Sequence, residues 1–370
     1  MKKIILIKIS LILISTKIFG QTIPQNLIVE TGKIEGSAYR IVIPENWNNN
    51  LILMAHGYFM EKIENYDKEI RSPFYLKLLD EGFALGESGY QKTGWAVEEA
   101  FQDIENLRIH FNKKHPKPDS LYLIGLSMGG LITLGLIEMN PSIYNGALLL
   151  APVVCSANFF HNYLLDRLLV FEYFYPGNDI INDTFFIDPS IPLTDAESFT
   201  KVLSTNSDHA NLISEKFNIK SKFLPLILYA YYDAYKDLYL RGGGVPIDNI
   251  NKYYLGFKND IEINKNIRRI RGNNKAIEYN NKYYTPTGKI SVPIISLTHT
   301  SDPLVPCECN NYFRLKVMAT GTEEFYKQYY IEGNGHLDFD ESEWLMAFNI
   351  LRNWCSKGKK PDDEIFLHFD

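Results

Sequence analysis

Ser127 stands between Gly125 and Gly129 in the stretch "YLIGLSMGGLITLGL", residues 122–136. The stretch begins with an apolar run typical of a buried strand and continues with small and apolar residues at helical spacing. A serine in a G-x-S-x-G pattern is a nucleophile when it sits on a sharp strand-to-helix turn, because that turn lifts its hydroxyl above the sheet. We therefore predict that Ser127 is a catalytic nucleophile. An ordinary glycine-rich bend is the alternative.

A serine nucleophile needs a general base, because its hydroxyl is weakly nucleophilic at its own pKa. Among the eight histidines, His336 in "IEGNGHLDF" directly follows the last predicted strand, in a loop bounded by glycines. That place in the chain puts the ring at the edge of the sheet where the nucleophile is expected. We predict His336 as the base, with His299, which closes another strand, as its main rival.

The base in turn needs a carboxylate that sets its tautomer and stabilises the imidazolium. Asp302 in "SLTHTSDPLVP" directly follows a predicted strand, whereas Asp338 and Asp340 lie on the loop of the histidine itself. The order Ser, Asp, His, each just past a strand, is a known order of a catalytic triad. We predict Asp302 as the acid; a turn-forming aspartate before Pro303 is the alternative.

Acyl transfer through a serine also needs backbone N–H donors for the oxyanion. One donor is expected from the residue after the nucleophile, Met128. The other is expected from the loop after the strand that ends in "AHGY", residues 55–58. A tight turn at His56-Gly57 aims the N–H of Tyr58 inward, so we predict Met128 and Tyr58 as the oxyanion hole.

The pattern of elements explains how these residues come together. An antiparallel hairpin is expected in "LIVETG" and "SAYRIVIPE", and apolar runs predict buried strands at 50–58, 82–90, 119–127, 146–154, 290–299 and 324–333. Helical spacing is seen at 94–111, 128–140, 309–319 and 341–357. Buried strands that alternate with helices predict an α/β fold with a mainly parallel sheet flanked by helices.

The segment 155–289 is too long to be a loop of a compact domain. It is rich in tyrosine and phenylalanine and shows helical spacing but no strands. We predict a mostly helical cap inserted after the sixth strand, which ends near Val154. The hydrolytic core then comprises residues 21–154 and 290–370.

The first 20 residues have the pattern of a secretory signal peptide: Lys2 and Lys3, then an apolar stretch, then the small Gly20 before Gln21. An uncleaved N-terminal helix is the alternative. We expect a secreted or periplasmic protein with no stable membrane span after cleavage. In an oxidising compartment the four cysteines can form disulfides, and Cys155 is expected to pair with Cys307 or Cys309.

Composition excludes other classes of function. The net charge of −6 and the pI near 5.8 argue against a partner that is a nucleic acid. The C-x-C spacing of Cys307 and Cys309 has no companion histidine pair, so no metal is implied. We expect no cofactor.

The quoted stretches together resemble the α/β-hydrolases, in particular secreted bacterial esterases and the prolyl-oligopeptidase-like group. The resemblance covers "YRIVIPENWNNNLILMAHGY", "GYQKTGWAVEEAFQD", "GLSMGG", "VPIISLTHTSDPLVP" and "GNGHLDFD" and hardly touches the helical insertion. It implies a triad of Ser127, Asp302 and His336.

Several functions remain open at this stage, including an acyltransferase, which differs from a hydrolase only in the nucleophile that takes the acyl group. The favoured one is an exported serine hydrolase that cleaves carboxylic esters, acting on a small-molecule or oligomeric substrate through an acyl-enzyme. The second keeps the triad but cleaves peptides, as a prolyl or aminopeptidase type. The third is a catalytically silent binding protein on the same fold, which is disfavoured because every catalytic position holds a usable residue.

Overall fold

The computed structural model describes residues 26–189 and 194–362. The predicted signal peptide lies outside these residues. The chain divides into two compact units. The core unit runs to Pro152 and contains Gly288–Asp302 and the chain from Arg314 onward; the helical unit comprises Val153–Thr287 and Pro303–Phe313.

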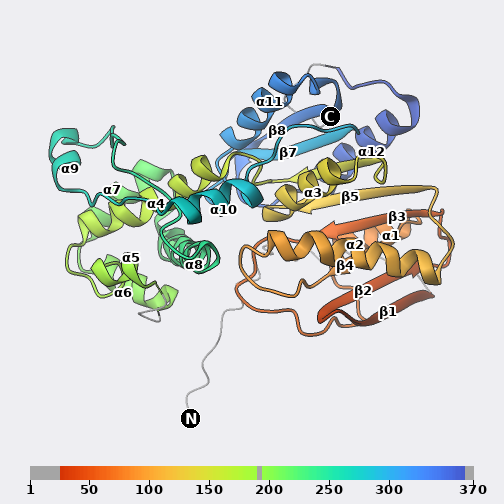
Figure 1. The fold of residues 1–370 in the computed structure, drawn as a ribbon, viewed down its shortest axis with the longest axis horizontal. Helices are drawn as coiled ribbons and strands as arrows, with labels where there is room; N and C mark the ends of the chain where they lie inside the picture. Colours follow the sequence, from red (N-terminus) through yellow and green to blue (C-terminus); the bar gives the residue numbers. More distant parts are fainter. Residues whose placement is uncertain (1–25, 190–193, 363–370) are drawn as a thin grey trace, which may run out of the picture. The chain divides into compact units, whose positions relative to one another are not determined.

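The core unit is built on one eight-stranded sheet (Figure 1). Its strands are β1 (Leu27–Ile34), β2 (Ser37–Pro44), β3 (Asn50–Ala55), β4 (Ala84–Ser88), β5 (Ser120–Leu126), β6 (Gly146–Leu150), β7 (Ile294–Ser301) and β8 (Tyr326–Asn334). The strand order is β1-β2-β4-β3-β5-β6-β7-β8. β2 runs antiparallel to β1 and β4, and the pairs from β4 to β8 are parallel. The predicted α/β class, with a mainly parallel sheet, is confirmed.

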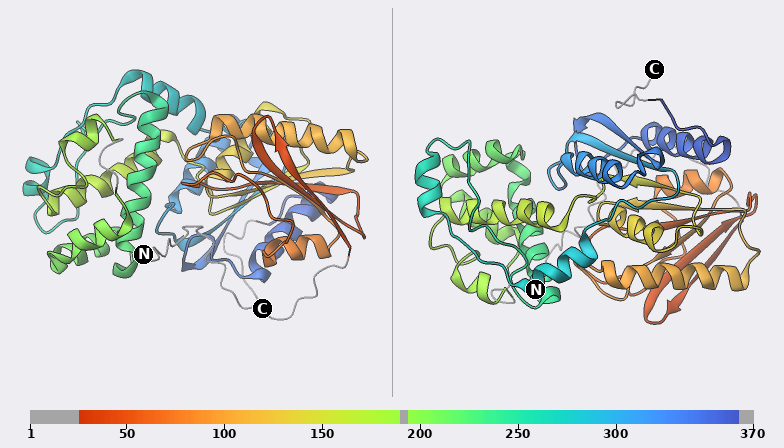
Figure 2. Two further views of the ribbon diagram at one scale, coloured as in Figure 1. Left: turned by 90° about the horizontal axis from the view of Figure 1, so that it is seen from below. Right: turned by 45° about the horizontal axis from the view of Figure 1, so that its top comes forward.

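Helices cover both faces of this sheet, as the two views in Figure 2 show. α1 (Pro73–Asp80) and α12 (Glu341–Lys357) pack on one face, where Leu78, Phe348 and Leu351 join the apolar side chains of the strands. α2 (Val97–Lys114) and α3 (Met128–Met139) pack on the other. Because both faces are buried, the central strands carry continuous apolar runs rather than alternating ones.

Two strand boundaries differ from the predicted ones for local reasons. β6 ends at Leu150 rather than near Val154, because Ala151 has a φ of 45° and Pro152 follows it. β7 begins at Ile294 rather than at residue 290, because Pro293 has no N–H to donate to the sheet. The helix α1 is an addition to the predicted elements; Ser72 caps its N-terminus and Pro73 occupies its first turn.

The helical unit contains seven α-helices and no strand in the part of the chain that the structure describes. They are α4 (Ala157–Phe174), α5 (Asp183–Ile187), α6 (Ala196–Ser204), α7 (Ser207–Phe217), α8 (Leu224–Gly242), α9 (Asp260–Asn266) and α10 (Asn274–Tyr284). A disulfide joins Cys155, just before α4, to Cys309 in α11 (Glu308–Thr320). Across the described residues, no helix combines the length and apolar character that crossing a bilayer requires.

Candidate active site

Ser127 occupies a sharp turn between β5, which ends at Leu126, and α3, which begins at Met128. Its backbone has φ 55° and ψ −118°, a conformation that non-glycine residues rarely adopt. The turn is held because Ser127 N donates to Leu150 O at 2.9 Å and Gly130 N donates to Ser127 O at 2.9 Å. Strain of this kind persists only where the surroundings impose it, and such sites are often functional.

The two glycines of the motif are required by the packing of α3 on the sheet. A Cβ at Gly129 would lie 1.9 Å from the carbonyl oxygen of Ala55 on β3. A Cβ at Gly125 would lie 2.5 Å from the carbonyl oxygen of Gly129. Both distances are far below van der Waals contact, so only glycine allows α3 to begin this close to the strands. The turn at Ser127 is therefore a strand-to-helix elbow and not an ordinary bend.

Asp302 and His336 meet beyond the ends of β7 and β8. The Nδ1 of His336 lies 2.7 Å from Oδ2 of Asp302, the geometry of an N–H donating to a carboxylate. The side chain of Asp302 is fully buried, and that of His336 is 6% exposed. This contact leaves Nε2 of the imidazole as the nitrogen that exchanges a proton with a nucleophile. In the described part of the chain, no hydrogen bond joins His336 to Ser127.

Contacts between the two loops place this pair. Gly335 N donates to Ser301 O at 3.0 Å, and Asn334 Nδ2 donates to Ser301 Oγ at 2.8 Å. The β7–β8 register continues as far as the pairing of Ser301 with Asn334, past a bulge. Ser301 and Asn334 were not singled out by the sequence. The feature of the sequence that could have identified them is their position next to Asp302 and His336, at the ends of two strands expected to be adjacent and parallel.

The rival histidine and the rival acid have other surroundings. His299 is 6% exposed, and its ring stacks on that of Phe339 with centroids 4.6 Å apart. Burial lowers the pKa of His299, although the carboxylates of Asp302 and Asp338 oppose that shift. Asp338 folds back on its own loop, with Oδ2 only 2.5 Å from where a Cβ of Gly335 would be. The carboxylate that accepts the hydrogen bond from His336 Nδ1 is thus that of Asp302.

The predicted oxyanion turn lies against the elbow. A Cβ placed on Gly57 would be 3.1 Å from Ser127 Cβ and 3.7 Å from Ser127 Oγ. Tyr58 follows that glycine, and its ring packs edge-on against Trp95 at 5.5 Å between centroids. Met128 is the first residue of α3, where a backbone N–H has no acceptor within the helix. The structure therefore brings the Gly57 turn next to Ser127 and its neighbour Met128.

His56 holds this turn in place, a role that sequence reasoning missed. Its ring lies between Phe59, at 4.5 Å, and Tyr90, at 3.9 Å between centroids, and stacks on both. Its Nδ1 lies 2.7 Å from Gly57 O, so this nitrogen carries the proton and donates. Burial lowers the pKa of His56 to about 4. A neutral ring in that stack supports the backbone of Gly57 and Tyr58.

A polar clamp supports Tyr90, the far side of this stack. Asp103 on α2 accepts hydrogen bonds from Gln91 N at 2.8 Å and from Gln91 Nε2 at 2.7 Å. Asp103 is 3% exposed, and Tyr90 itself adopts a φ of 51°. The quoted stretch "GYQKTGWAVEEAFQD" contains both partners, but nothing in their spacing indicates that they pair.

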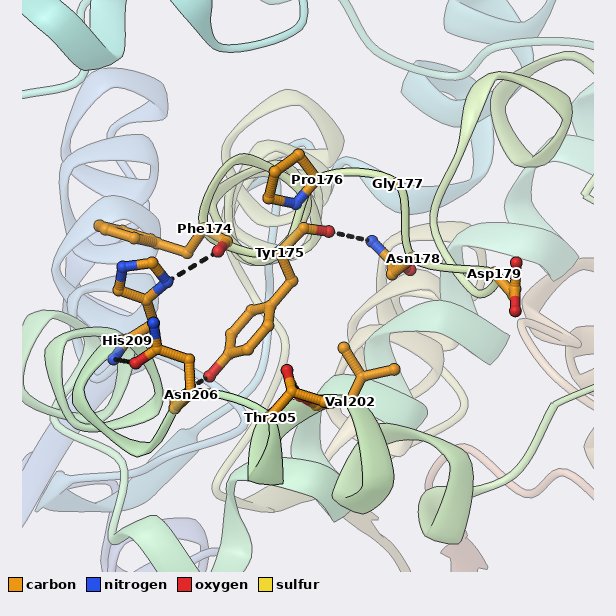
Figure 3. Close-up of a pocket in the computed structure, with 10 residues that line it drawn as sticks. All are labelled: Phe174, Tyr175, Pro176, Gly177, Asn178, Asp179, Val202, Thr205, Asn206 and His209. Carbon is orange, nitrogen blue, oxygen red and sulfur yellow. Dashed lines mark hydrogen bonds between the residues drawn. The ribbon is translucent and has the colours of Figure 1, made fainter.

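The helical unit has a pocket of its own, with a volume of about 380 Å³ (Figure 3). Its inward polar groups already have partners in the protein. His209 Nδ1 lies 2.8 Å from Phe174 O, Tyr175 Oη donates to Asn206 O, and Asn178 Nδ2 donates to Tyr175 O. Because these groups are satisfied internally, we assign this pocket no ligand. Over the described residues, no three His, Cys, Asp or Glu side chains gather in a way that could hold a metal ion.

Comparisons with known proteins give two matches by sequence. Residues 82–241, which include the elbow, match the family model described as "Serine aminopeptidase, S33". An o-phthalyl amidase of Xanthobacter agilis is 20% identical over 403 residues, which is 89% of this chain and 87% of the amidase.

Solved structures with a similar arrangement have low sequence identity. The Francisella virulence factor BioJ is 13% identical with a TM-score of 0.49, and the match covers 90% of this chain and 86% of that one. The acylaminoacyl peptidase of Pyrococcus horikoshii is 10% identical with a TM-score of 0.48. That match covers 94% of this chain but only 44% of the peptidase, so the chain spans less than half of its length.

The family-model match includes the serine elbow, and the loops after β7 and β8, which lie outside the match, bring Asp302 and His336 together. Over residues 82–241, the chain is therefore similar to serine hydrolases of the α/β-hydrolase superfamily.

Proposed function

We propose that this protein is an exported serine hydrolase that cleaves carboxylic esters through a triad of Ser127, His336 and Asp302. The observation that carries the proposal is the buried 2.7 Å contact between His336 Nδ1 and Asp302 Oδ2. It lies past the ends of β7 and β8, which are two and three strands along the sheet from β5, the strand that Ser127 follows. A histidine oriented by a buried carboxylate is the base that a serine nucleophile needs.

In the first half of the reaction, Ser127 Oγ attacks the carbonyl carbon of the ester while His336 Nε2 takes the hydroxyl proton. The C–O bond to the alcohol then breaks, and the imidazolium returns that proton to the leaving alkoxide. The acyl group remains on Ser127 as an ester. Asp302 stays ionised and stabilises the imidazolium throughout.

In the second half, water replaces the alcohol. His336 takes a proton from the water as its oxygen attacks the acyl carbon, and the proton returns to Ser127 Oγ as the acid leaves. Both tetrahedral intermediates carry a negative oxygen. We assign its hydrogen-bond donors to the backbone N–H groups of Met128 and Tyr58, which flank the contact between Gly57 and Ser127.

Export is part of this proposal. It is supported by the charged and apolar pattern of residues 1–20, and by the disulfide between Cys155 and Cys309, a bond that persists in oxidising compartments. The test is to express the full chain in a bacterial host and to determine the N-terminus of the protein found outside the cytoplasm. A mature protein beginning at Gln21 is expected; a full-length chain retained in the cytoplasm would contradict export.

Amide cleavage on the same triad is the second candidate. It is favoured by the description of the matching family model, a serine aminopeptidase, and by the name of the relative, an amidase. The triad chemistry is the same for both bonds except that the leaving group is an amine, which His336 must protonate before the C–N bond breaks.

One comparison tests the proposal and separates the candidates. The wild type, Ser127→Ala and the control Ser120→Ala are assayed on p-nitrophenyl esters of graded acyl length and on a panel of peptide anilides. We expect ester turnover by the wild type and by Ser120→Ala, and a loss in kcat of about 10⁴-fold or more for Ser127→Ala. A fluorophosphonate probe should label only the two proteins that keep Ser127.

Other outcomes decide against ester cleavage. Anilide turnover at rates that exceed ester turnover would make the protein an amidase or peptidase. A wild type that neither turns over any substrate nor binds the probe would support the silent binding protein. Labelling that persists in Ser127→Ala would place the nucleophile elsewhere.

A further inference from the structure

Arg167 on α4 is a buried cation whose charge is not neutralised by an acid within the described residues. Only 6% of the residue is exposed, and no ion pair involves it. Two other arginines of the helical unit are paired: Arg241 with Asp237 at 2.8 Å, and Arg268 with Glu172 at 2.5 Å. A buried charge without a counter-ion is costly, so its presence needs a reason.

The guanidinium is held flat between aromatic rings. Its Cζ lies 3.2 Å from the ring centroid of Tyr163 and 4.4 Å from that of Phe217 on α7. Its Nη1 donates to the carbonyl oxygen of Tyr163 at 2.7 Å. These contacts orient the group and partly stabilise its charge through the ring faces, but no carboxylate neutralises it.

One edge of the guanidinium has no partner. The Nε atom is buried without a hydrogen-bond acceptor, and Nη2 forms no hydrogen bond with the residues that the structure describes. The Nε and Nη2 hydrogens are parallel, and together they match the two oxygens of a carboxylate. The vacant edge of Arg167 therefore has the geometry for a bidentate carboxylate and lies beside aromatic rings.

The polar groups near Arg167 are consistent with an unpaired guanidinium edge. The adjacent carboxylate of Asp166 is engaged by Lys252 Nζ at 2.5 Å, so it does not serve Arg167. Ser214 lies three residues before Phe217 on α7, hence on the same face of that helix. Ser214 is 5% exposed, and its buried Oγ has no hydrogen-bond partner. It is a second unsatisfied donor on the helix face that stacks on the cation.

We propose that Arg167, stacked between Tyr163 and Phe217, is a binding site for the carboxylate of a small aromatic acid. Tyr163 is only partly buried. The guanidinium edge takes the two carboxylate oxygens of the ligand, and the edges of the neighbouring rings contact its aromatic part.

A neighbour of the site contacts the segment Pro303–Phe313 of the same unit. Tyr231, whose ring packs edge-on against Tyr163 at 6.1 Å, donates its hydroxyl proton to Pro303 O at 2.7 Å. Pro303 directly follows Asp302. The carboxylate belongs either to the substrate or to a separate free acid. This distinction rests on the proposed function, whereas the binding site itself does not.

Binding is tested without catalysis, by thermal unfolding with sodium benzoate and, as neutral probe, benzamide, at constant ionic strength. The wild type is compared with Arg167→Met, Arg167→Lys and the paired-arginine control Arg268→Met. We expect a saturable rise in Tm with benzoate only, lost in Arg167→Met, weakened in Arg167→Lys and kept in Arg268→Met. Without ligand, Arg268→Met should lower Tm more than Arg167→Met, because only the former leaves an acid unpaired.

A wild type with no saturable response to benzoate overturns the proposal, and so does a benzoate response that survives in Arg167→Met. An equal response to benzamide also overturns it, because a neutral amide has no charge for the guanidinium. Isothermal titration of Arg167→Lys, which keeps the charge but not the paired N–H edge, confirms that the loss concerns binding and not folding.

The source of the carboxylate is decided by kinetics. If the substrate carries it, kcat/KM for p-nitrophenyl hemiglutarate relative to p-nitrophenyl butyrate falls by about tenfold or more in Arg167→Met and not in Arg268→Met. If a free acid binds, that ratio stays constant, and benzoate changes the butyrate rate of the wild type but not of Arg167→Met. Should the wild type hydrolyse neither ester, the proposed function fails, while the benzoate titration still decides the binding site.

Discussion

The core unit and the helical unit place their polar side chains by different means. In the core unit, the elbow at Ser127 is set by backbone packing, since a Cβ at Gly129 would collide with Ala55 O. In the helical unit, Arg167 is set by side chains, between the rings of Tyr163 and Phe217. Backbone packing leaves a local pattern in the sequence, whereas aromatic stacking between separate helices leaves none.

This difference explains why one site was visible in the sequence and the other was not. Ser127, Asp302 and His336 each directly follow a strand of a parallel sheet, so chain position alone predicts that they share an edge. Arg167 lies within a helix whose aromatic neighbours could equally be core packing. Only the contacts of its guanidinium distinguish a buried cation from a surface one.

The largest expected effect lies in the core unit, at the acid. Asp302→Asn should lower kcat by about 10⁴-fold, because an amide in place of the carboxylate favours the wrong tautomer of His336. The matched control is Asp338→Asn on the neighbouring loop, for which we expect a change of less than about tenfold. Both are measured as kcat on the best p-nitrophenyl ester. The reverse ranking of the two variants would move the acid to the loop of His336.

Glycine substitutions compare backbone packing in the two units. Gly129→Ala should destabilise the protein by about 3 kcal/mol or more, since its Cβ would sit 1.9 Å from Ala55 O and the helix must move. Gly177→Ala in the helical unit should cost about 1 kcal/mol, because its φ of 72° is strained for alanine but no atom lies within 4 Å.

Urea unfolding gives the two free energies for these glycine variants. If both variants lose the same free energy of unfolding, the elbow tolerates a shift of α3. Backbone packing would then not be stricter in the core unit than in the helical unit. A folded Gly129→Ala protein that has lost fluorophosphonate labelling would show the shift directly at Ser127.

Reduction of the disulfide should act on the helical unit. The bond between Cys155 and Cys309 closes a loop with a sequence separation of 154, so replacing both by serine is expected to cost about 2–5 kcal/mol. Hydrogen exchange should rise in α4 and α8 and remain unchanged in β3 and β5. Cys307→Ser and Cys355→Ser serve as controls, because neither thiol is in a disulfide. An equal loss of protection against hydrogen exchange in both units would contradict an effect confined to the helical unit.

A further expected effect is a dependence of the protein's stability on pH. Burial lowers the pKa of His161 to about 3, below the ordinary value of 6.5 that it regains on unfolding. The unfolded chain then binds a proton that the folded one does not, so stability is full above pH 6.5 and falls as the pH drops toward 3.

His161→Phe should remove this contribution, which amounts to about 1–2 kcal/mol at pH 5. The measurement is the difference in unfolding free energy between pH 7 and pH 5 for each protein. Identical differences would show that His161 is not kept neutral by burial. In the core unit, His56→Phe should likewise reduce the fall in unfolding free energy at low pH. The range of pH is narrower for His56, because its pKa is lowered only to about 4.

Much of the fold was predictable because its signals are local. Apolar runs and helical spacing predicted all eight strands and the helices α2, α3, α11 and α12, since both faces of a parallel sheet must be covered. The helix α1 was missed, although Ser72 and Pro73 are a recognisable start. Strand ends shifted at Ala151 and Pro293, where backbone conformation and not hydropathy sets the limit.

The supporting side chains of the site were not predictable. The stack of His56 between Phe59 and Tyr90 joins residues up to 34 positions apart, and the clamp of Asp103 on Gln91 joins residues 12 apart. In sequence, each of these residues has an ordinary structural interpretation.

The amino-acid sequence by itself determined the α/β fold and the elbow at Ser127, because glycine spacing and apolar periodicity act over a few residues. Only the tertiary structure decided that Asp302 contacts His336, that Cys155 joins Cys309, and that Arg167 is buried with no acid from the described residues paired to it. These three depend on which distant segments touch, and a pairing across 34 or 154 residues is selected by packing and not by any local propensity.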